Sequence, residues 1–470
     1  MLLECASVWL SVILILLAAV SLAQADVIVL KNGKRIVVDT AREKNGRIEY
    51  EIGDNTFAIS RSLVDRLESG GLPLTAGHDV APKFAPSETL PVSGDLTSKL
   101  IHDGKVDTDV LATLSQSSDL ELVAGAYAYA AKFEQDHGNP DRAIRYYGLA
   151  LAQLPNNNRI LDHYASLLVQ IGRGDQAIPL AERSTRVAPS SADGWMVLGF
   201  AYYASDRNPD AIRAWQRSLE LRPDSTVEKY LDKALKDANI QANYQQRDSG
   251  HFSLKYEGRK VSSELSNGIL QVLEQNYDDL AGEFTTSPKN ISVILYTDQA
   301  FFDVTQSPSW TGAINDGKIR VPVSGLTTVT PELSRILRHE LSHTFINQLC
   351  RGKCPQWLHE GVAQLVEPRS AAPYGQTLAK LFADQHEVPM NLLEGSFLNL
   401  GSREAAVAYI QSLAVAEYIR DTYGMDDILR ILRRIGEGAS TESALRSTVH
   451  SGYQQLETEV GQYLQSRYGK

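Results

Sequence analysis

One sequence period constrains the fold of this 470-residue chain more than any other feature. Pro155, Pro189 and Pro223 follow one another at intervals of 34 residues. Three further positions repeat in the same phase, two of them small and one bulky: Ala131, Ala165 and Gly199; Ala143, Ala177 and Ala211; Tyr127, Leu161 and Trp195. Small side chains at fixed places let the two helices of each unit approach closely. The period therefore predicts a helical solenoid in which each unit packs on its neighbours.

A unit of 34 residues is the length of the tetratricopeptide repeat, a pair of helices. We expect three repeats over residues 124–225 and a capping helix over 226–241, within a helical region that spans 96–241. Arrays of this kind present a concave groove that binds peptides or partner proteins. A rigid spacer is the alternative role, and the sequence does not identify a partner.

The first 25 residues are typical of a signal peptide. The stretch from Val8 to Ala23 is almost continuously apolar, and Ala23-Gln24-Ala25 supplies the small residues of a cleavage site. This pattern predicts an exported protein, periplasmic or secreted. The segment before the apolar stretch contains Glu4 and no Lys or Arg, so an uncleaved leader that anchors the chain to a membrane stays open. The stretch is short for a stable span, which favours removal.

Residues 26–68 predict a small β-rich module. Apolar strand patterns flank Asn32-Gly33, a pair that favours a hairpin turn, and further glycines separate the later strand patterns. Residues 69–95 then have the composition of a linker, with four prolines and several Gly and Ser.

The strongest chemical signal is His-Glu-Leu-Ser-His at residues 339–343. Two histidines four residues apart on a helix lie on one face, so His339 and His343 can bind one metal ion. Glu360 on a following helix can supply the third ligand, which leaves one tetrahedral position for water. The expected cofactor is one Zn²⁺ per chain. It would lower the pKa of that water to about 7, and Glu340 would accept its proton as general base.

The flanking sequence predicts how these residues come together. Thr330-Pro331-Glu332 has the features of a helix start, and the helix should run to about Leu349. A turn at residues 351–353 should lead into a second helix from Pro355 to about Glu367. Two antiparallel helices joined by a short turn would return the carboxylate of Glu360 to the histidines.

These residues resemble a known family, the peptidase MA-like gluzincin domains of bacteria, which are often fused to tetratricopeptide repeats. The resemblance covers roughly residues 250–470 and includes CPQWLHEGVAQLVE at 354–367 and AYIQSLAVAEYIRDTYG at 408–424. Metzincins instead have a third histidine six residues after the second, where this chain has Leu349. The resemblance implies an α+β domain with a small sheet before the motif, helices after it, and zinc metallopeptidase activity of gluzincin type on peptides or proteins.

The resemblance also suggests one further catalytic residue and one departure. Tyr409 matches a tyrosine that stabilises the oxyanion in relatives, although an ordinary aromatic of an amphipathic helix is the alternative. Relatives commonly have an acid where this chain has Gln364, and that acid orients a histidine ligand. Glu367, one turn later, is a possible substitute, although its default interpretation is a solvated acid at a helix end.

Two cysteines flank the turn between the zinc helices. Cys5 would leave with the leader, so Cys350 and Cys354 remain. In an oxidising compartment they could form a disulfide that pins the helix of Glu360 relative to the histidines. We expect this disulfide, with two free thiols or a redox pair as alternatives.

A segment before the motif predicts a place for substrate. Residues 310–314 and 317–323 alternate like an edge strand bounded by Gly and Pro. An edge strand beside the metal could bind an extended peptide by strand addition. A plain edge of a small sheet is the equal alternative.

The sequence therefore predicts a multidomain protein: a β-rich module, a helical tetratricopeptide solenoid and an α+β gluzincin domain over residues 250–470. The predicted function is an exported zinc peptidase whose repeats bind a protein. The alternative is a noncatalytic scaffold protein with a vestigial peptidase domain, which a fourth protein ligand would favour. His359 is the candidate for that ligand, but adjacent helix residues diverge by about 100°, so we expect it to point away or to contact the ligands from outside.

Composition excludes some partners. The net charge of −11 does not predict nucleic-acid binding, which usually requires a basic surface. Outside the leader, no segment has the length and apolar composition of a membrane helix.

Overall fold

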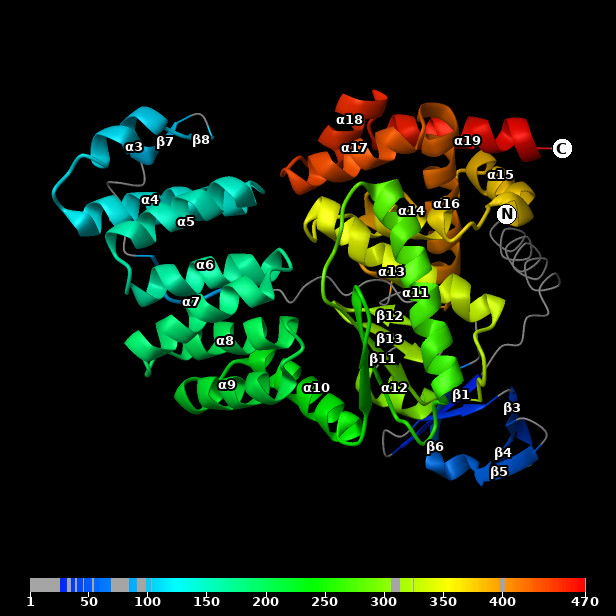
Figure 1. Cartoon of the computed structure of the whole chain (residues 1–470). Coiled ribbons are helices and arrows are strands. Elements are labelled where there is room, and N and C mark those ends of the chain that lie inside the picture. The colour runs from blue at the N-terminus through cyan, green and yellow to red at the C-terminus, as the bar shows by residue number, and fades with distance from the viewer. Residues whose placement is uncertain are drawn as a thin grey trace.

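The chain folds into three parts: a β module, a helical solenoid and a mixed α/β domain (Figure 1). The computed structural model describes residues 26–31, 35–38, 40–44, 46–52, 55–68, 84–90, 99–102, 104–305, 313–323, 325–397 and 402–469. The three parts confirm the predicted fold class. The predicted signal peptide, residues 1–25, lies outside the described residues. Within the described part of the chain, no helix combines the length and the apolar character needed to cross a membrane.

The β module consists of two antiparallel sheets of three strands, in the orders β2-β1-β6 and β3-β4-β5. Its strands are β1 (Asp26–Leu30), β2 (Arg35–Val38), β3 (Thr40–Lys44), β4 (Arg47–Ile52), β5 (Asn55–Ser60) and β6 (Val64–Glu68). Strands β1 and β2 pair as the hairpin pattern predicts, although the Asn32-Gly33 turn itself lies outside the described residues. Ile28, Ile48 and Val64 form the small core.

Three helix pairs form the predicted solenoid, which Figure 1 shows as a stack beside the α/β domain. The pairs are α4 (Leu120–Asp136) with α5 (Pro140–Gln153), α6 (Asn158–Gln170) with α7 (Gly174–Val187), and α8 (Ala192–Ala204) with α9 (Asn208–Leu221). The capping helix is α10 (Ser225–Gln241), and the short strands β7 (Ile101–His102) and β8 (Lys105–Val106) and helix α3 (Thr108–Leu114) precede the array.

Close helix contacts explain the small residues of the period. A Cβ atom on Gly199 would lie 2.3 Å from the indole ring of Trp215, which is far closer than packed atoms allow. Ala143, Ala177 and Ala211 are all fully buried between helices. The repeated small side chains therefore set the spacing within each pair, as the sequence predicts.

The α/β domain begins with a mixed five-stranded sheet in the order β12-β13-β11-β10-β9. Its strands are β9 (Gln245–Asp248), β10 (Phe252–Tyr256), β11 (Ile291–Tyr296), β12 (Ile314–Asn315) and β13 (Ile319–Pro322). The predicted edge is confirmed at Ile314, which lies in the outermost strand β12, and is wrong for residues 319–322, because β13 pairs with β11 on one side and β12 on the other. The two-residue strand β12 is the edge, and residues 310–312 of the predicted edge segment lie outside the described residues.

Helices make up the rest of this domain, most of them near their expected positions. They are α11 (Ser263–Phe284), α12 (Asp298–Thr305), α13 (Pro331–Cys350), α14 (Gln356–Val366), α15 (Gly375–Ala383), α16 (Ser402–Tyr423), α17 (Met425–Gly436), α18 (Thr441–Val449) and α19 (Tyr453–Tyr468). The sequence pattern missed the two short helices α12 and α18. One continuous core joins the sheet, α13, α14 and the later helices.

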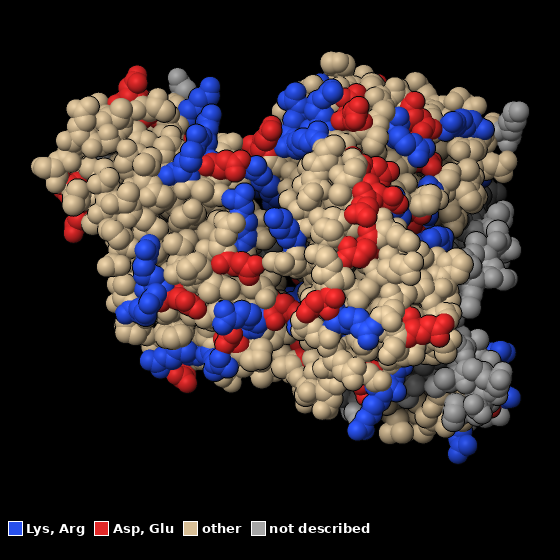
Figure 2. Space-filling model, in the orientation of Figure 1, with Lys and Arg blue, Asp and Glu red and all other residues tan. Residues whose placement is uncertain are grey.

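Buried and partly buried charged side chains join the repeats to the α/β domain. We call them the interdomain ion cluster: Asp206, Lys233 and Asp237 from the repeat region, and Lys255, Asp316, Lys318 and Arg320 from the domain. Arg320 Nη1 donates to Asp237 Oδ1 at 2.7 Å, and Lys318 Nζ donates to Asp206 Oδ1 at 2.6 Å. On the face drawn in Figure 2, side chains of both signs also follow the seam between the two lobes. The repeats and the domain are therefore held together by paired charges.

Candidate metal centre

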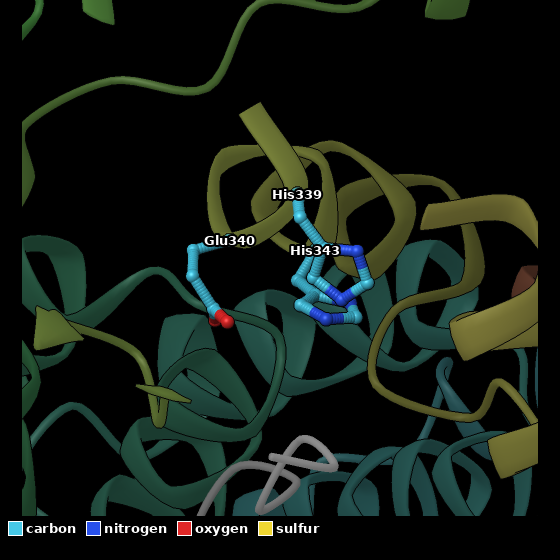
Figure 3. A group of neighbouring side chains, drawn as sticks. All are labelled: His339, Glu340 and His343. Atoms are coloured by element: carbon cyan, nitrogen blue, oxygen red, sulfur yellow. The ribbon is translucent and has the colours of Figure 1, made fainter. Parts of the chain in front are cut away.

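Helix α13 carries both motif histidines on its buried face. The helix starts as predicted, with Thr330 Oγ1 accepting a hydrogen bond from the backbone N–H of Leu333 at 3.1 Å. His339 and His343 are fully buried, and their ring centroids lie 4.7 Å apart. Figure 3 shows the two imidazole rings together, with the Glu340 side chain extending from the same helix beside them.

The chain reverses after α13 and brings Glu360 back to the histidines. Arg351 and Gly352 both adopt positive φ angles, 51° and 72°, which end the helix and turn the chain. Glu360 Oε2 then lies 3.4 Å from His339 Nε2, and Glu360 Oε1 lies 3.7 Å from His343 Nε2. Three side chains that the motif separates by up to 21 residues thus meet at one point in the core.

Gly361 allows this close approach of α14 to the rest of the domain. A Cβ atom at Gly361 would lie 2.4 Å from the carbonyl oxygen of Ser412 on α16. Any larger residue would push α14 away from α16 and shift Glu360, its neighbour in the sequence.

A surrounding set of polar side chains holds the site residues in place. Glu367 Oε2 lies 3.0 Å from His339 Nδ1, and Gln356 Nε2 donates to Glu360 Oε1 at 3.0 Å. The interpretation of Glu367 as a solvated acid is therefore wrong, since Glu367 is buried and replaces the acid expected at the position of Gln364. Gln364 instead donates to the backbone carbonyls of Glu360 and Tyr409. Sequence reasoning missed Gln356, although its spacing of four residues from Glu360 puts both on one helix face.

Glu340 is buried beside the histidines with an unusual environment. Among the described residues, neither oxygen of its carboxylate has a hydrogen-bond partner. Burial raises the pKa of the Glu340 carboxyl to about 8. Its backbone carbonyl accepts a hydrogen bond at 2.7 Å from Asn315 Nδ2, which also donates to Thr344 Oγ1 at 2.8 Å. Asn315, on edge strand β12, thus fixes α13 against the sheet, and no sequence pattern marked it.

The donor atoms of this cluster fit a divalent cation. Ligand atoms of His339, Glu340 and His343 all lie within 4.8 Å of one another, and so do those of His343, His359 and Glu360. Burial opposes protonation of His339, but the nearby carboxylates of Glu360 and Glu367 outweigh it and raise the pKa of His339 to about 10. Imidazole nitrogen and carboxylate oxygen are donors that zinc prefers in proteins, and a cation would neutralise the carboxylates buried here.

Comparison with known proteins agrees with this geometry. Residues 276–466 match the family model described as Peptidase MA superfamily. Part of the chain is 32% identical over 85 residues to the small glutamine-rich tetratricopeptide repeat-containing protein 2 of Mycosarcoma maydis, and 28% identical over 123 residues to the protein of that name in Saccharomyces cerevisiae. These matches confirm the resemblance to a peptidase MA domain combined with tetratricopeptide repeats.

The similarity to individual proteins is partial. The two fungal matches cover 18% and 26% of this chain, and the chain spans only 24% and 34% of those relatives. Two solved structures, "MamA RS-1 ArsTM double mutant" and "MamA AMB-1 C2221", are 20% and 21% identical in sequence to the matched part of this chain. The matches cover 27% and 28% of this chain and 70% and 79% of the two solved chains. Their TM-scores are 0.25 and 0.24.

Within the region that matches the family model, His359 lies against the cluster. Its ring stacks on His343, with centroids 4.5 Å apart and planes 9° apart, and its Nε2 atom lies 3.2 Å from Asn347 Oδ1. Of the two positions expected for His359, the structure has the second, a contact with a predicted ligand from outside. The reason is that α14 packs against α13, so a side chain next to Glu360 still faces α13.

Tyr409 is buried on α16, the helix that packs against α14. Its carbonyl accepts a hydrogen bond from Gln364 at 3.0 Å, and its ring meets Phe397 edge-on at 5.2 Å between centroids. The structure thus brings Tyr409 to the helix that carries Glu360. Its role with an oxyanion stays a prediction.

The expected disulfide is not formed. Cys350 and Cys354 are free thiols, of which Cys350 is buried. Cys350 is the last residue of α13, and its thiol donates to the carbonyl of Ile346, one turn back, at 2.9 Å. The backbone turn at Arg351 and Gly352 and the packing of α14 hold the two helices together without a covalent link.

Proposed function

We propose that this protein is a zinc-dependent peptidase of gluzincin type whose repeats bind a protein partner. One observation carries the proposal: His339, His343 and Glu360 converge in the core of a peptidase MA domain, with the carboxylate of Glu340 beside them. His339, His343 and Glu360 would hold one zinc ion per chain. Bound zinc would polarise a peptide carbonyl and lower the pKa of a bound water to about 7.

The protein's own residues supply the remaining chemistry. Glu340 accepts the proton of the attacking water and passes it to the leaving amine. Glu367 fixes the ring of His339 through Nδ1, which directs Nε2 toward Glu360. Tyr409 donates a hydrogen bond to the oxyanion in this proposal. Substrates are peptides or proteins, and the buried position of Glu340 excludes bulk water from the base.

The place of action follows from the leader. We propose that the protein is exported to the periplasm or the medium of a bacterial cell, on the basis of the apolar leader and small-residue site in residues 1–25. A retained leader would instead anchor the protein to the membrane.

Glu340→Gln tests the hydrolytic assignment directly. The substitution keeps the shape of the side chain and removes the base, so we expect retained zinc and a loss of peptide hydrolysis by about 10²–10⁴-fold. Zinc content is measured by mass spectrometry of the intact protein, and hydrolysis by cleavage of a peptide library with and without chelator. Exposed Glu332→Gln on the same helix is the matched control and should keep full activity. Full turnover by the Glu340 variant would contradict the assignment.

The position of His359 favours a second candidate, a closed structural metal site in a scaffold protein. Four protein ligands would leave no place for water. His359→Gln separates the two functions: an outer contact to His343 predicts unchanged zinc stoichiometry and a loss of metal affinity of at most about 10–100-fold. Equilibrium competition with a chromogenic chelator measures that affinity. The scaffold function would be favoured if the His359 variant lost all zinc and the parent protein hydrolysed no peptide.

A further inference from the structure

A short segment of the chain lies across the first helices of the repeats. Residues 84–90, which we call the docked segment, have no regular secondary structure. Phe84 is buried, and its ring stacks on Phe200 of α8 with centroids 4.0 Å apart and planes 13° apart. At the other end, Leu90 packs against the core of the first two repeats. The first helices of such repeats line the groove of the array, so the docked segment occupies the place where a peptide would bind.

Side chains of the repeats hold the backbone of the docked segment. Gln170 Nε2 donates to the carbonyl of Phe84 at 2.8 Å, and His163 Nε2 lies 3.0 Å from the carbonyl oxygen of Glu88. The backbone N–H of Glu88 donates to Asp193 Oδ2 at 2.7 Å. Backbone groups that make no helix or sheet are satisfied here by side chains, which is how an extended peptide of any sequence can be held.

Two side chains of the docked segment add sequence selectivity. Ser87 Oγ donates to the buried carboxylate of Asp193 at 3.1 Å and accepts from Arg222 Nη1 at 2.8 Å. The Glu88 carboxylate lies 3.3 Å from Arg159 Nε. It also accepts a hydrogen bond from Ser191 Oγ at 3.2 Å. The groove thus matches an aromatic residue followed, three and four positions later, by serine and glutamate.

The residues that hold the segment are not those that build the repeats. Arg159 and Asp193 are 34 positions apart and so occupy the same place in successive repeats, yet they carry opposite charges. The positions one period before and after His163 hold Tyr129 and Val197. By contrast, the helix-packing positions keep one size in every repeat. The polar groups that hold the segment therefore vary from repeat to repeat, although Asp193 and Gln170 also bond to side chains of the solenoid.

We propose that the repeat groove binds an exposed, extended segment of a partner protein with this pattern, an aromatic residue followed three and four positions later by serine and glutamate. The docked segment is its internal competitor, and a partner binds by displacing it. A segment of the same chain competes for the groove at millimolar effective concentration. The apparent affinity for a partner is then the intrinsic affinity multiplied by the fraction of molecules whose groove is open. This inference deepens the partner-binding role proposed for the repeats and involves no hydrolysis.

The test uses the full chain with Glu340→Gln, so that no peptide is cut, and a fluorescent peptide with the sequence of residues 82–92. Fluorescence anisotropy measures its affinity for this parent and for a released variant with Phe84→Ala, Ser87→Ala and Glu88→Ala. Because the variant frees the groove, we expect the peptide to bind it at least about 10-fold more tightly. Thr89→Ala, at an exposed position of the same segment, is the matched control and should bind like the parent.

Three further measurements make the result decisive. Gln170→Ala in the released variant should weaken peptide binding, and a peptide with alanine in place of its Phe, Ser and Glu should not bind. The proposal would be overturned if the parent and the released variant bound the peptide with equal affinity. It would also be overturned if the alanine peptide bound the released variant as tightly as the peptide of residues 82–92. Concentration-dependent dimers of the parent in analytical ultracentrifugation that the released variant does not form would overturn it too, because the segment would then dock in a second copy. Failure of the proposed peptidase activity would leave every one of these measurements unchanged.

Discussion

The interdomain ion cluster and the candidate metal centre are both buried groups of charged side chains, but they balance their charge differently. In the ion cluster, Asp237 and Asp316 pair with the guanidinium of Arg320, and Asp206 pairs with two lysines. The guanidinium is permanently charged, and lysine amines ordinarily carry positive charge near pH 7. In the metal centre, Glu360 and Glu367 instead face His339, which becomes positively charged only by taking up a proton, and these carboxylates raise its pKa to about 10.

This difference identifies which cluster is complete. The carboxyl groups of the ion cluster find their cations within the protein. Burial raises the pKa of Asp206, but Lys318 and Lys255 outweigh that effect and lower it to about 2. Glu340 in the metal centre has no comparable partner among the described residues, and burial dominates its pKa. The first cluster is built to join two domains, and the second is suited to a cation from solution.

Arg320→Met tests the completeness of the ion cluster and should have the largest effect on stability. It leaves Asp237 and Asp316 buried without their strongest partner, and loss of one member of a buried pair costs about 3–5 kcal/mol. Urea unfolding followed by circular dichroism measures the change. Arg335→Met, which removes an exposed pair with Glu332, is the control and should change stability by less than about 1 kcal/mol. An equal effect of both would show that the cluster does not hold the domains together.

Metal removal should act on the other cluster alone. Free zinc at a concentration of 100 times its Kd stabilises the folded protein by about 2.7 kcal/mol. Dialysis against chelator should therefore lower the free energy of unfolding by about 2.7 kcal/mol. Hydrogen exchange should accelerate in α13 and α14 and stay unchanged in α4–α9. Uniform acceleration in every helix, repeats included, would contradict the separation of the two clusters.

Acid should weaken the ion cluster by a smaller amount. The folded pKa of Asp206 is about 2, below its usual value near 3.8, so its stabilising effect is full above about pH 4 and is lost as the pH falls through 2. The loss amounts to about 2 kcal/mol. Between pH 5 and 2, the free energy of unfolding should fall less steeply with pH in Asp206→Asn than in the parent protein. Asp65→Asn, at an exposed pair with Arg66, should keep the parental slope. Identical slopes for the Asp206 variant and the parent would remove Asp206 from the cluster.

The sequence by itself determined the features that repeat or that depend on local spacing. The 34-residue period predicted three helix pairs, because small residues must recur wherever two helices meet. The spacing of four residues put His339 and His343 on one face, and the Thr330-Pro331 start defined the beginning of α13. Such signals are local, so a single chain read in order is enough to find them.

Only the tertiary structure decided which distant polar groups meet. Glu367 against His339, Asn315 against the carbonyl of Glu340, and His359 against His343 are contacts between elements whose register the sequence does not state. The same holds for Phe84 on Phe200 and for the free thiols of Cys350 and Cys354. Packing and burial decide which polar groups pair across helices. A buried polar group without a partner costs more free energy than a residue's local structural preference can offset.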